Sequence, residues 1–276
     1  MPMTSFNPVF NPVTNGHQID AQYDRRFGGT KTLYGHDAMQ RFGNAHVYVI
    51  GIGGVGSWAA EALARTAVGE LTLIDMDVLV ASNINRQLPA LDSSLGQSKI
   101  EAMALRLHQI NPRLTLNLCD EFVTQNNVNQ LLPSRQDKDK AHQKGRGMVI
   151  LDCTDDMSAK VHIALHCRFN KLKLVCAGGA GSKTDPTRIG ISDLKDTTQD
   201  PLLARLRNKL RQEHGINREL KTKFGIRCVY SDQPPEHSKV GSQAHGLQCG
   251  GYGSAVVMTA SMGMVMASEA LRLLVM

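Results

Sequence analysis

The chain has 276 residues and a net charge of +6, from 31 basic and 25 acidic side chains. Its hydrophobic fraction of 42% and charged fraction of 20% are typical of a globular protein, and they exclude a disordered or fibrous chain. Residues 202–228 carry eight basic and two acidic side chains, so this one segment accounts for the whole positive excess. A local excess favours docking of an anionic partner and argues against a uniformly basic packaging protein.

The cysteines and the two ends of the chain indicate a cytoplasmic protein. Residues 1–22 are polar and rich in Asn and Pro, so we expect a mobile segment and no signal peptide. The six cysteines form no CxxC pair, which excludes a four-thiolate zinc site of that spacing, and their low density favours a reducing compartment. Residues 255–276 are apolar, but Glu269 and Arg272 interrupt a run already shorter than the roughly 20 residues of a spanning helix. We therefore expect a buried terminal helix and no stable insertion into a membrane.

Strand and helix patterns alternate along the chain. Apolar runs predict strands at residues 45–51, 70–75, 113–118, 148–153 and 172–177, and amphipathic or helix-forming stretches predict helices at 57–68, 98–110 and 157–169. This alternation predicts an α/β fold, namely a Rossmann-like, doubly wound and mainly parallel sheet with helices on both faces.

Two insertions interrupt the alternation. Residues 134–147 are charged and contain glycine, and we expect a solvated loop there. The second insertion is basic and covers about residues 196–228. Within it, Asp200 and Pro201 form a helix start, and the following leucines share one face while the basic side chains largely occupy the other.

A glycine-rich loop follows the first predicted strand directly. Its sequence GIGGVGS, residues 51–57, contains Gly51, Gly53, Gly54 and Gly56 and leads into a predicted helix. Glycines let the backbone approach a phosphate closely, and the helix start presents free N–H groups. Asp75 stands 24 residues after Gly51, at the end of the next strand, where a carboxylate can bind ribose hydroxyls. The pattern predicts a nucleotide site; a tight turn without a ligand is the alternative.

The residues after Asp75 favour ATP over NAD. The following sequence adds polar and basic side chains that hydride transfer does not need: Asp77, then Asn83 and Arg86 in the run SNINRQ, and then Lys99. The two basic side chains could hold phosphate groups. Transfer of AMP does need them, because charge builds on the α-phosphate and the departing pyrophosphate. Asp155, just after another strand, could hold magnesium that bridges the phosphates.

These motifs, in this order, resemble the ubiquitin-activating-enzyme-like superfamily, the ThiF/MoeB/HesA adenylation fold. The resemblance rests on GIGGVGS, DMDVLVASNINRQ, the lysine of GQSK and LDCTDD, and it covers about residues 23–180. It implies a single adenylating domain over residues 23–276, with ATP and Mg²⁺ as cofactors. It further implies that Asp75 binds ribose, that Asn83, Arg86 and Lys99 contact the phosphates, and that Asp155 is the magnesium ligand.

Two more residues follow from the same resemblance. Arg25, in YDRRF, matches an arginine that reaches the ATP site of the partner subunit in this superfamily, which implies a homodimer. Asp156 stands where the superfamily usually has Asn, and we expect either an added metal contact or a tolerated change.

Within the superfamily, the chain resembles the bacterial tRNA threonylcarbamoyladenosine dehydratases more closely. RFGG and LYG near the start, the lack of two CxxC pairs, the basic insertion and the apolar terminal helix support this. The implied activity is ATP-dependent cyclisation, a net dehydration, of threonylcarbamoyladenosine beside the anticodon through an acyl-adenylate. The expected contacts to tRNA phosphates are basic residues of the insertion: Arg205, Arg207, Lys209, Arg211, Lys221 and Lys223.

Three other functions are also compatible with the sequence. The first is adenylation of the C-terminal glycine of a ubiquitin-like sulfur carrier, which would use the same ATP site. The others are an ATP-sensing binding module and an NAD dehydrogenase. A sulfur-transfer or cysteine-desulfurase-system protein is a further candidate partner, and Cys249 or Cys228 is the candidate thiol for an acyl or sulfur relay.

Overall fold

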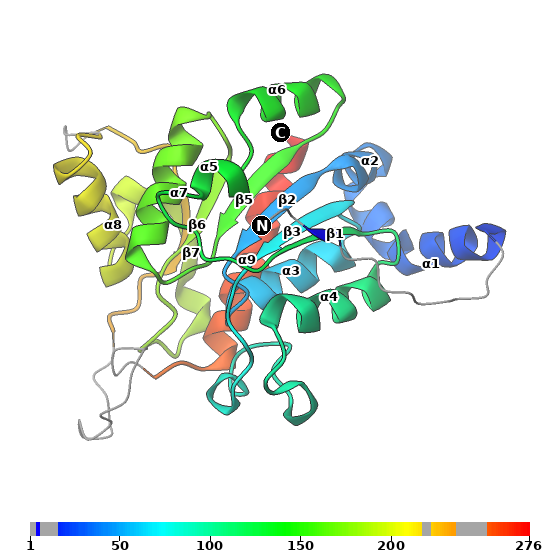
Figure 1. Cartoon of the computed structure of the whole chain (residues 1–276), viewed down its shortest axis with the longest axis horizontal. Helices are drawn as coiled ribbons and strands as arrows, with labels where there is room; N and C mark the ends of the chain where they lie inside the picture. Colours follow the sequence, from blue (N-terminus) through cyan, green and yellow to red (C-terminus); the bar gives the residue numbers. More distant parts are fainter. Residues whose placement is uncertain (1–3, 6–15, 217–221, 236–252) are drawn as a thin grey trace.

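The computed structural model describes residues 4–5, 16–216, 222–235 and 253–276. A single twisted sheet lies between two layers of helices (Figure 1). Its strands run in the order β1-β4-β3-β2-β5-β6-β8-β7. Six strands are mutually parallel: β2 (His46–Ile50), β3 (Glu70–Ile74), β4 (Thr115–Cys119), β5 (Met148–Asp152), β6 (Leu174–Ala177) and β8 (Arg227–Ser231). The predicted Rossmann-like, mainly parallel sheet is confirmed.

Both edges of the sheet carry an antiparallel strand that the sequence did not predict. The short strand β1 (Thr4–Ser5) pairs with β4, and β7 (Ile189–Asp193) pairs with β8. The described part of the 1–22 segment therefore contains a strand and, from Gly16, the start of a helix. The mobility expected of that segment stays a prediction.

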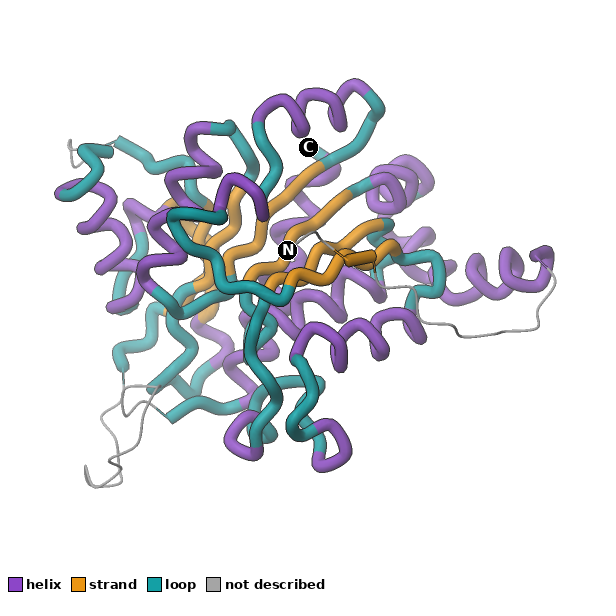
Figure 2. Tube along the Cα trace, in the orientation of Figure 1, coloured by secondary structure: helices purple, strands orange, loops and turns teal. Residues whose placement is uncertain are grey.

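Helices cover the two faces of the sheet in separate groups (Figure 2). One apolar core lies under α2 (His36–Asn44), α3 (Gly56–Arg65), α4 (Lys99–Ile110) and α9 (Val256–Val275). The other core lies under α5 (Val128–Leu131), α7 (Met157–Phe169) and α8 (Pro201–Gln212). Two further helices, α1 (Gly16–Tyr34) and α6 (Arg135–Gln143), lie toward the periphery.

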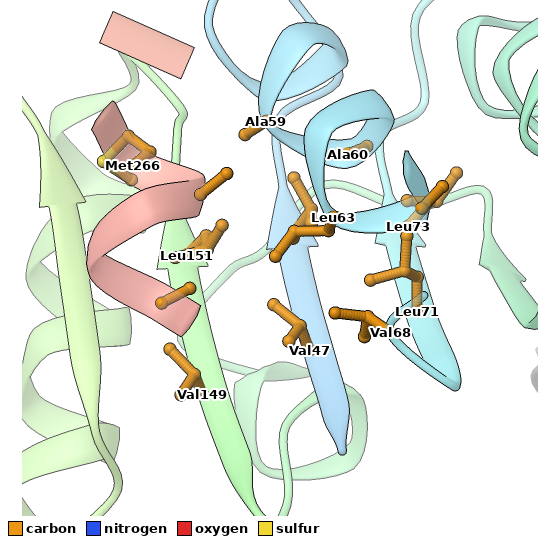
Figure 3. Close-up of a cluster of buried hydrophobic side chains, with 14 of the residues drawn as sticks. Val47, Ala59, Ala60, Leu63, Val68, Leu71, Leu73, Val149, Leu151 and Met266 are labelled. Atoms are coloured by element: carbon orange, nitrogen blue, oxygen red, sulfur yellow. The ribbon is translucent and has the colours of Figure 1, made fainter. Parts of the chain in front are cut away.

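The strands are buried on both sides because their residues alternate between these two cores. Val47 and Val49 of β2 point to the core under α3 and α9, whereas Tyr48 and Ile50 point to the opposite core. Figure 3 shows the first core, in which Val47, Leu63 and Leu151 meet between the strands and helix α3. Because both faces of these strands are buried, their sequences are continuous apolar runs, and those runs are the pattern that predicted them.

Helix α9 is the apolar terminal helix predicted from the sequence. It is long and apolar enough for a membrane-span candidate, but half of that stretch is buried, and the helix packs on α3 and on strands β5, β6 and β8. A Cβ at Gly263 would lie 2.6 Å from the carbonyl oxygen of Val55, so glycine is what allows α9 to approach the start of α3. Glu269, 2% exposed, pairs with Arg227 and Arg272 and ties the helix to β8.

The charged insertion 134–147 contains a helix, α6, over Arg135–Gln143, so the prediction of a loop throughout it was wrong. The Ser134 hydroxyl accepts a hydrogen bond from the Asp137 backbone N–H, and the Asp137 carboxylate accepts one from the Ser134 backbone N–H. This reciprocal capping starts α6 despite its strongly polar composition. The start signal S-x-x-D was present in the sequence, and the high charge of the segment concealed it.

Candidate functional site

The chain reverses direction across the sheet between β2 and β5, and the phosphate loop lies there. From β2 the chain proceeds outward to β3 and β4, and it returns to β5 and β6 on the other side. In open α/β sheets a crevice at the carboxyl ends of such strands is the usual site for a ligand. Two loops meet at this edge of the sheet: the glycine-rich loop after β2, and residues 153–156 after β5. We call the region between these two loops the crevice.

Close packing joins the two loops. The backbone N–H of Cys153 donates to the carbonyl of Ile50 over 2.8 Å. Gly51 has a φ of +84°, and a Cβ there would lie 2.9 Å from the backbone nitrogen of Thr154. Glycine is therefore required at the start of the loop, both for the left-handed backbone and for the space.

The rest of the glycine loop is arranged for contact with an anion. A Cβ at Gly53 would have the side-chain nitrogen of Gln87, 3.9 Å away, as its nearest neighbour. This side of the loop is therefore open. Gly54 faces Thr259 of α9, and Gly56 begins α3, so the loop leads directly into a helix start, where N–H groups without an intrahelical acceptor can bind an anion. The Ser57 hydroxyl donates to the Gly53 carbonyl over 2.7 Å and holds the turn.

Asp75, the predicted ribose ligand, is buried at the end of β3. One carboxylate oxygen accepts the N–H of Ile52 at 2.6 Å, and the other accepts the N–H of Asp77 at 2.9 Å. Burial raises the pKa of Asp75, while the charge of Lys99 and these two hydrogen bonds oppose the rise. The carboxylate thus fixes the first turn of the phosphate loop and still has lone pairs for ribose hydroxyls.

Lys99, at the start of α4, is placed to contact an anion in the same crevice. Its side chain is only 8% exposed, and its Nζ lies 2.6 Å from a carboxylate oxygen of Asp77. Its backbone N–H also donates to the Asp77 carbonyl over 3.0 Å. Asp77, predicted as a nucleotide-binding residue, therefore binds and orients the Lys99 ammonium. A bound triphosphate would have to share that ammonium with the Asp77 carboxylate.

Asn83 and Arg86 lie on a segment that is attached to two helices. The buried Asn83 uses its side-chain oxygen to accept the N–H of Val80. The Arg86 carbonyl accepts hydrogen bonds from the Trp58 indole of α3 at 3.1 Å and from the Thr259 hydroxyl of α9 at 3.4 Å. The half-buried Arg86 guanidinium donates to the Ser82 carbonyl and to Asn85, which leaves other N–H groups for phosphate oxygens.

Asp155 is exposed in the loop after β5, beside the phosphate loop. Its neighbour Asp156 has a different task, because its carboxylate accepts the N–H of Ala159 at 2.7 Å and caps α7. No group of three His, Cys, Asp or Glu side chains able to hold a metal occurs among the described residues. Asp155 could therefore bind magnesium only together with phosphate oxygens and water, which is the usual coordination of Mg²⁺ at a nucleotide.

Arg25 lies away from the crevice in its own chain. It is exposed on α1, which extends to one side of the molecule beyond α2 (Figure 1). The neighbouring Arg26 donates to the carbonyls of Gln109 and Ile110 at the end of α4 and so helps to hold this part of α1. The structure does not bring Arg25 together with Arg86 and Lys99 within one chain.

The predicted basic residues of the insertion divide into two groups. Arg205 and Lys223 are exposed, and Lys209 pairs with Glu213 at the surface. Arg207 instead donates to the carbonyls of Leu194 and Thr197, and the Arg211 guanidinium lies 5.2 Å from the centre of the Phe224 ring. The latter two residues stabilise α8 against its surroundings, and Lys221 lies outside the described residues.

The cysteines offer one correction. Cys228 is fully buried on β8, and burial raises the pKa of its thiol well above the usual value. A thiol with no exposed surface and little thiolate cannot relay an acyl or sulfur group from this position. Cys167 and Cys176 are buried core residues, and Cys249 lies outside the described residues.

Sequence reasoning missed three residues around the crevice. Trp58 anchors the Arg86 segment, and Gln87, 6% exposed, turns its side chain toward Gly53. Lys160 lies fully buried beneath the loop after β5. For Lys160 a signal existed, because a lysine interrupts an otherwise apolar face of the helix at residues 157–169.

Comparison with known proteins agrees with this geometry. The model of the ThiF family matches residues 23–276. The tRNA threonylcarbamoyladenosine dehydratase of Haemophilus influenzae is 42% identical over 255 residues, which cover 91% of this chain and 93% of the relative. The dehydratase of the same name from Escherichia coli is 42% identical over 92% of this chain and 95% of its own length.

A solved structure extends the similarity to the fold. The crystal structure of the E. coli tRNA N6-threonylcarbamoyladenosine dehydratase in complex with ATP superposes with a TM-score of 0.80 and 41% identity. It covers 92% of this chain and 95% of that one. The E. coli molybdopterin-synthase adenylyltransferase is 32% identical, but over only 50% of this chain. The chain therefore belongs to the ThiF family, alongside the bacterial tRNA threonylcarbamoyladenosine dehydratases.

Proposed function

We propose that this chain is an ATP-dependent tRNA threonylcarbamoyladenosine dehydratase that acts through an acyl-adenylate. The observation that carries the proposal is that Arg86 and the loop before Asp155 lie against the glycine loop, and that Lys99 acts on Asp75, which holds that loop. This set suits transfer of AMP to a carboxylate. The similarity over nearly the full length to dehydratases, against half the length to a sulfur-carrier adenylating enzyme, supports the tRNA substrate.

Different residues of the crevice bind different parts of ATP. Asp75 holds the ribose, and the glycine loop with the start of α3 holds the phosphates through backbone N–H groups. Arg86 and Lys99 stabilise the charge that develops on the α-phosphate and on the departing pyrophosphate. Lys99 is oriented by Asp77, so its ammonium is in place before ATP arrives.

Asp155 would hold the magnesium ion. Its carboxylate is exposed at the crevice, and a hard oxygen donor of this kind is what Mg²⁺ prefers. When bound, the ion would neutralise charge on the pyrophosphate. Asp156 is not needed for this role, because it caps α7.

The reaction balances without a protein nucleophile. An oxygen of the threonyl carboxylate attacks the α-phosphate, and pyrophosphate leaves. An atom of the carbamoyl group of the same substrate then attacks the activated carbonyl carbon, and AMP leaves with the oxygen that joined it to the substrate. The ring that forms has lost one oxygen and two hydrogens, which is a net loss of water.

The proposal includes a homodimer and contact with tRNA. Arg25 would complete the ATP site of a partner subunit, because it lies away from the crevice of its own chain. Helix α8 begins at the same edge of the sheet, where its capping residue Asp200 accepts the N–H of Gly179 just after β6. Exposed basic residues of this insertion would bind tRNA phosphates close to the crevice. We further propose a cytoplasmic location and a sulfur-transfer protein as an additional partner.

Incubation with α-labelled ATP, Mg²⁺ and tRNA that carries threonylcarbamoyladenosine tests the function. The wild type should release labelled AMP and yield a base lighter by one water. Arg86→Ala should lower AMP formation by about 100-fold or more, since it removes a donor to the developing charge. Arg65→Ala is the matched control, because the exposed Arg65 at the end of α3 pairs with the buried Glu61, which keeps its other partner Arg106, so turnover should stay intact.

Two results would contradict the proposal. One is AMP release with a carrier protein ending in glycine but none with the modified tRNA, which would favour the sulfur-carrier function. The other is wild-type turnover in Arg86→Ala, which would remove the role assigned to Arg86.

A further inference from the structure

A fully buried ammonium lies directly beneath the crevice. The side chain of Lys160 on α7 has 0% exposure. Its Nζ lies 3.1 Å from a carboxylate oxygen of Asp152, 2.9 Å from the carbonyl oxygen of Ala177 and 3.4 Å from the sulfur of Cys176. An ammonium has three N–H donors, and each has an acceptor here.

Fold stability does not account for this arrangement. Burial alone would lower the pKa of Lys160, but the charge of Asp152 and the contact with Cys176 raise it above its ordinary value. A buried ion pair is often no more stabilising than apolar residues of similar volume. Met157 and Ile163, which flank Lys160 on α7, show that the apolar choice was available on this face.

The partner of Lys160 is joined to the loop that carries Asp155. One oxygen of Asp152 faces Lys160, and the other accepts the backbone N–H of Thr154 at 3.2 Å. At the other end of the loop, Asp156 caps α7. Asp155 is thus held between two fixed neighbours, and Thr154 abuts the Cβ position of Gly51 in the phosphate loop.

We propose that Lys160 is a positioning residue: through Asp152 and Thr154 it orients the Asp155 loop against the phosphate loop. This inference rests on the proposed function, because it concerns Mg²⁺ and ATP at that site. Lys160 touches neither group itself. Its effect reaches the crevice through one carboxylate, whose orientation sets the position of the Thr154 backbone.

A charge-balanced double variant separates this role from stability. Lys160→Met with Asp152→Asn removes both buried charges together and should fold, because no unpaired charge is left inside. ATP affinity is measured with EDTA and again with saturating Mg²⁺, by fluorescence of Trp58, the single tryptophan, which contacts the Arg86 carbonyl. We expect nearly unchanged affinity in EDTA and a loss of about 10-fold or more in the gain that Mg²⁺ confers.

Two controls keep the test decisive. Glu269→Gln breaks a similarly buried ion pair on α9 and should leave the Mg²⁺ effect unchanged. Lys160→Arg keeps the charge, but its planar guanidinium cannot match the three acceptors, so it should raise the Mg²⁺ requirement even if the double variant does not fold.

A wild-type Mg²⁺ effect in the double variant, or in Lys160→Arg, would overturn the proposal. An equal loss in Glu269→Gln would do the same, because it would show general destabilisation. Failure of the wild type to form AMP from the modified tRNA would instead contradict the proposed function, and the ATP-binding measurements would still test Lys160.

Discussion

His46 at the start of β2 is a single side chain whose charge is coupled to folding. The ring is 6% exposed, stacks on Tyr48 at 4.1 Å and makes a 2.7 Å hydrogen bond with the Thr72 hydroxyl. Burial lowers its pKa from 6.5 to about 4, although Glu70 nearby opposes the shift. The folded protein therefore holds His46 neutral at pH values where the unfolded chain would already protonate it.

This difference predicts a loss of stability in acid. Because the folded pKa lies below the unfolded one, the stabilisation is complete above about pH 6.5 and is lost as the pH falls toward about 4. The loss attributable to His46 should be about 3 kcal/mol over that window. Urea unfolding at a series of pH values measures it, with His46→Gln as the reference. Parallel curves for the two proteins would contradict the coupling.

At the same scale, only some site residues could be predicted from sequence. Gly51, Asp75 and Arg86 could, because the tight turn and the charge on phosphates demand those residue types at those spacings. The roles of Lys160 and Trp58 could not, although a lysine on the otherwise apolar face of the helix at residues 157–169 does single out Lys160. Their roles depend on which strand lies beside which, and the sequence does not state that β6 neighbours β5.

At the scale of elements, α8 shows that a basic stretch has two uses. Three leucines of this helix are fully buried, while Arg207 and Arg211 contact the protein itself. The charge excess that predicted a docking surface is therefore partly structural. The exposed residues Arg205 and Lys223 are the candidates for contact with tRNA.

Reversing these two exposed charges should weaken tRNA binding. Arg205→Glu with Lys223→Glu should also lower the slope of log affinity against log salt by about one for each phosphate that is no longer neutralised. Filter binding at several salt concentrations measures both quantities. Lys140→Glu, on the exposed face of α6, is the matched control. An unchanged slope would mean that Arg205 and Lys223 do not neutralise tRNA phosphates.

Element boundaries show what sequence periodicity can and cannot predict. The interval predicted for α7 coincides with the observed Met157–Phe169, because an apolar face and a capping residue agree there. The edge strand β7 was missed, since a strand partly exposed on one side of the sheet lacks a continuous apolar run. Helix α6 was missed because its strongly charged sequence has no apolar face, and the capping pair Ser134 and Asp137 is its main helix signal.

At the scale of the whole molecule, the proposed homodimer would give the exposed Arg25 a role in the ATP site of a second copy. A symmetric dimer would exchange two arginines, so each ATP site would combine Arg86 of one chain with Arg25 of the other.

Complementation between two inactive variants tests this arrangement. Arg25→Ala and Arg86→Ala should each be inactive alone. A mixture that exchanges subunits should recover up to about a quarter of the wild-type activity, because each mixed dimer has one intact site. AMP release after co-refolding measures the recovery. No recovery, despite mixed dimers seen by native mass spectrometry, would place Arg25 outside the partner's site.

The central claim is that a substrate carboxylate is activated as an acyl-adenylate in this crevice. Its most direct test uses tRNA whose threonylcarbamoyl carboxylate is labelled with ¹⁸O, incubated with ATP and Mg²⁺. We predict AMP that carries one ¹⁸O atom, because the carboxylate oxygen stays with the phosphorus when the ring closes. Unlabelled AMP, formed together with the cyclised base, would contradict the claim.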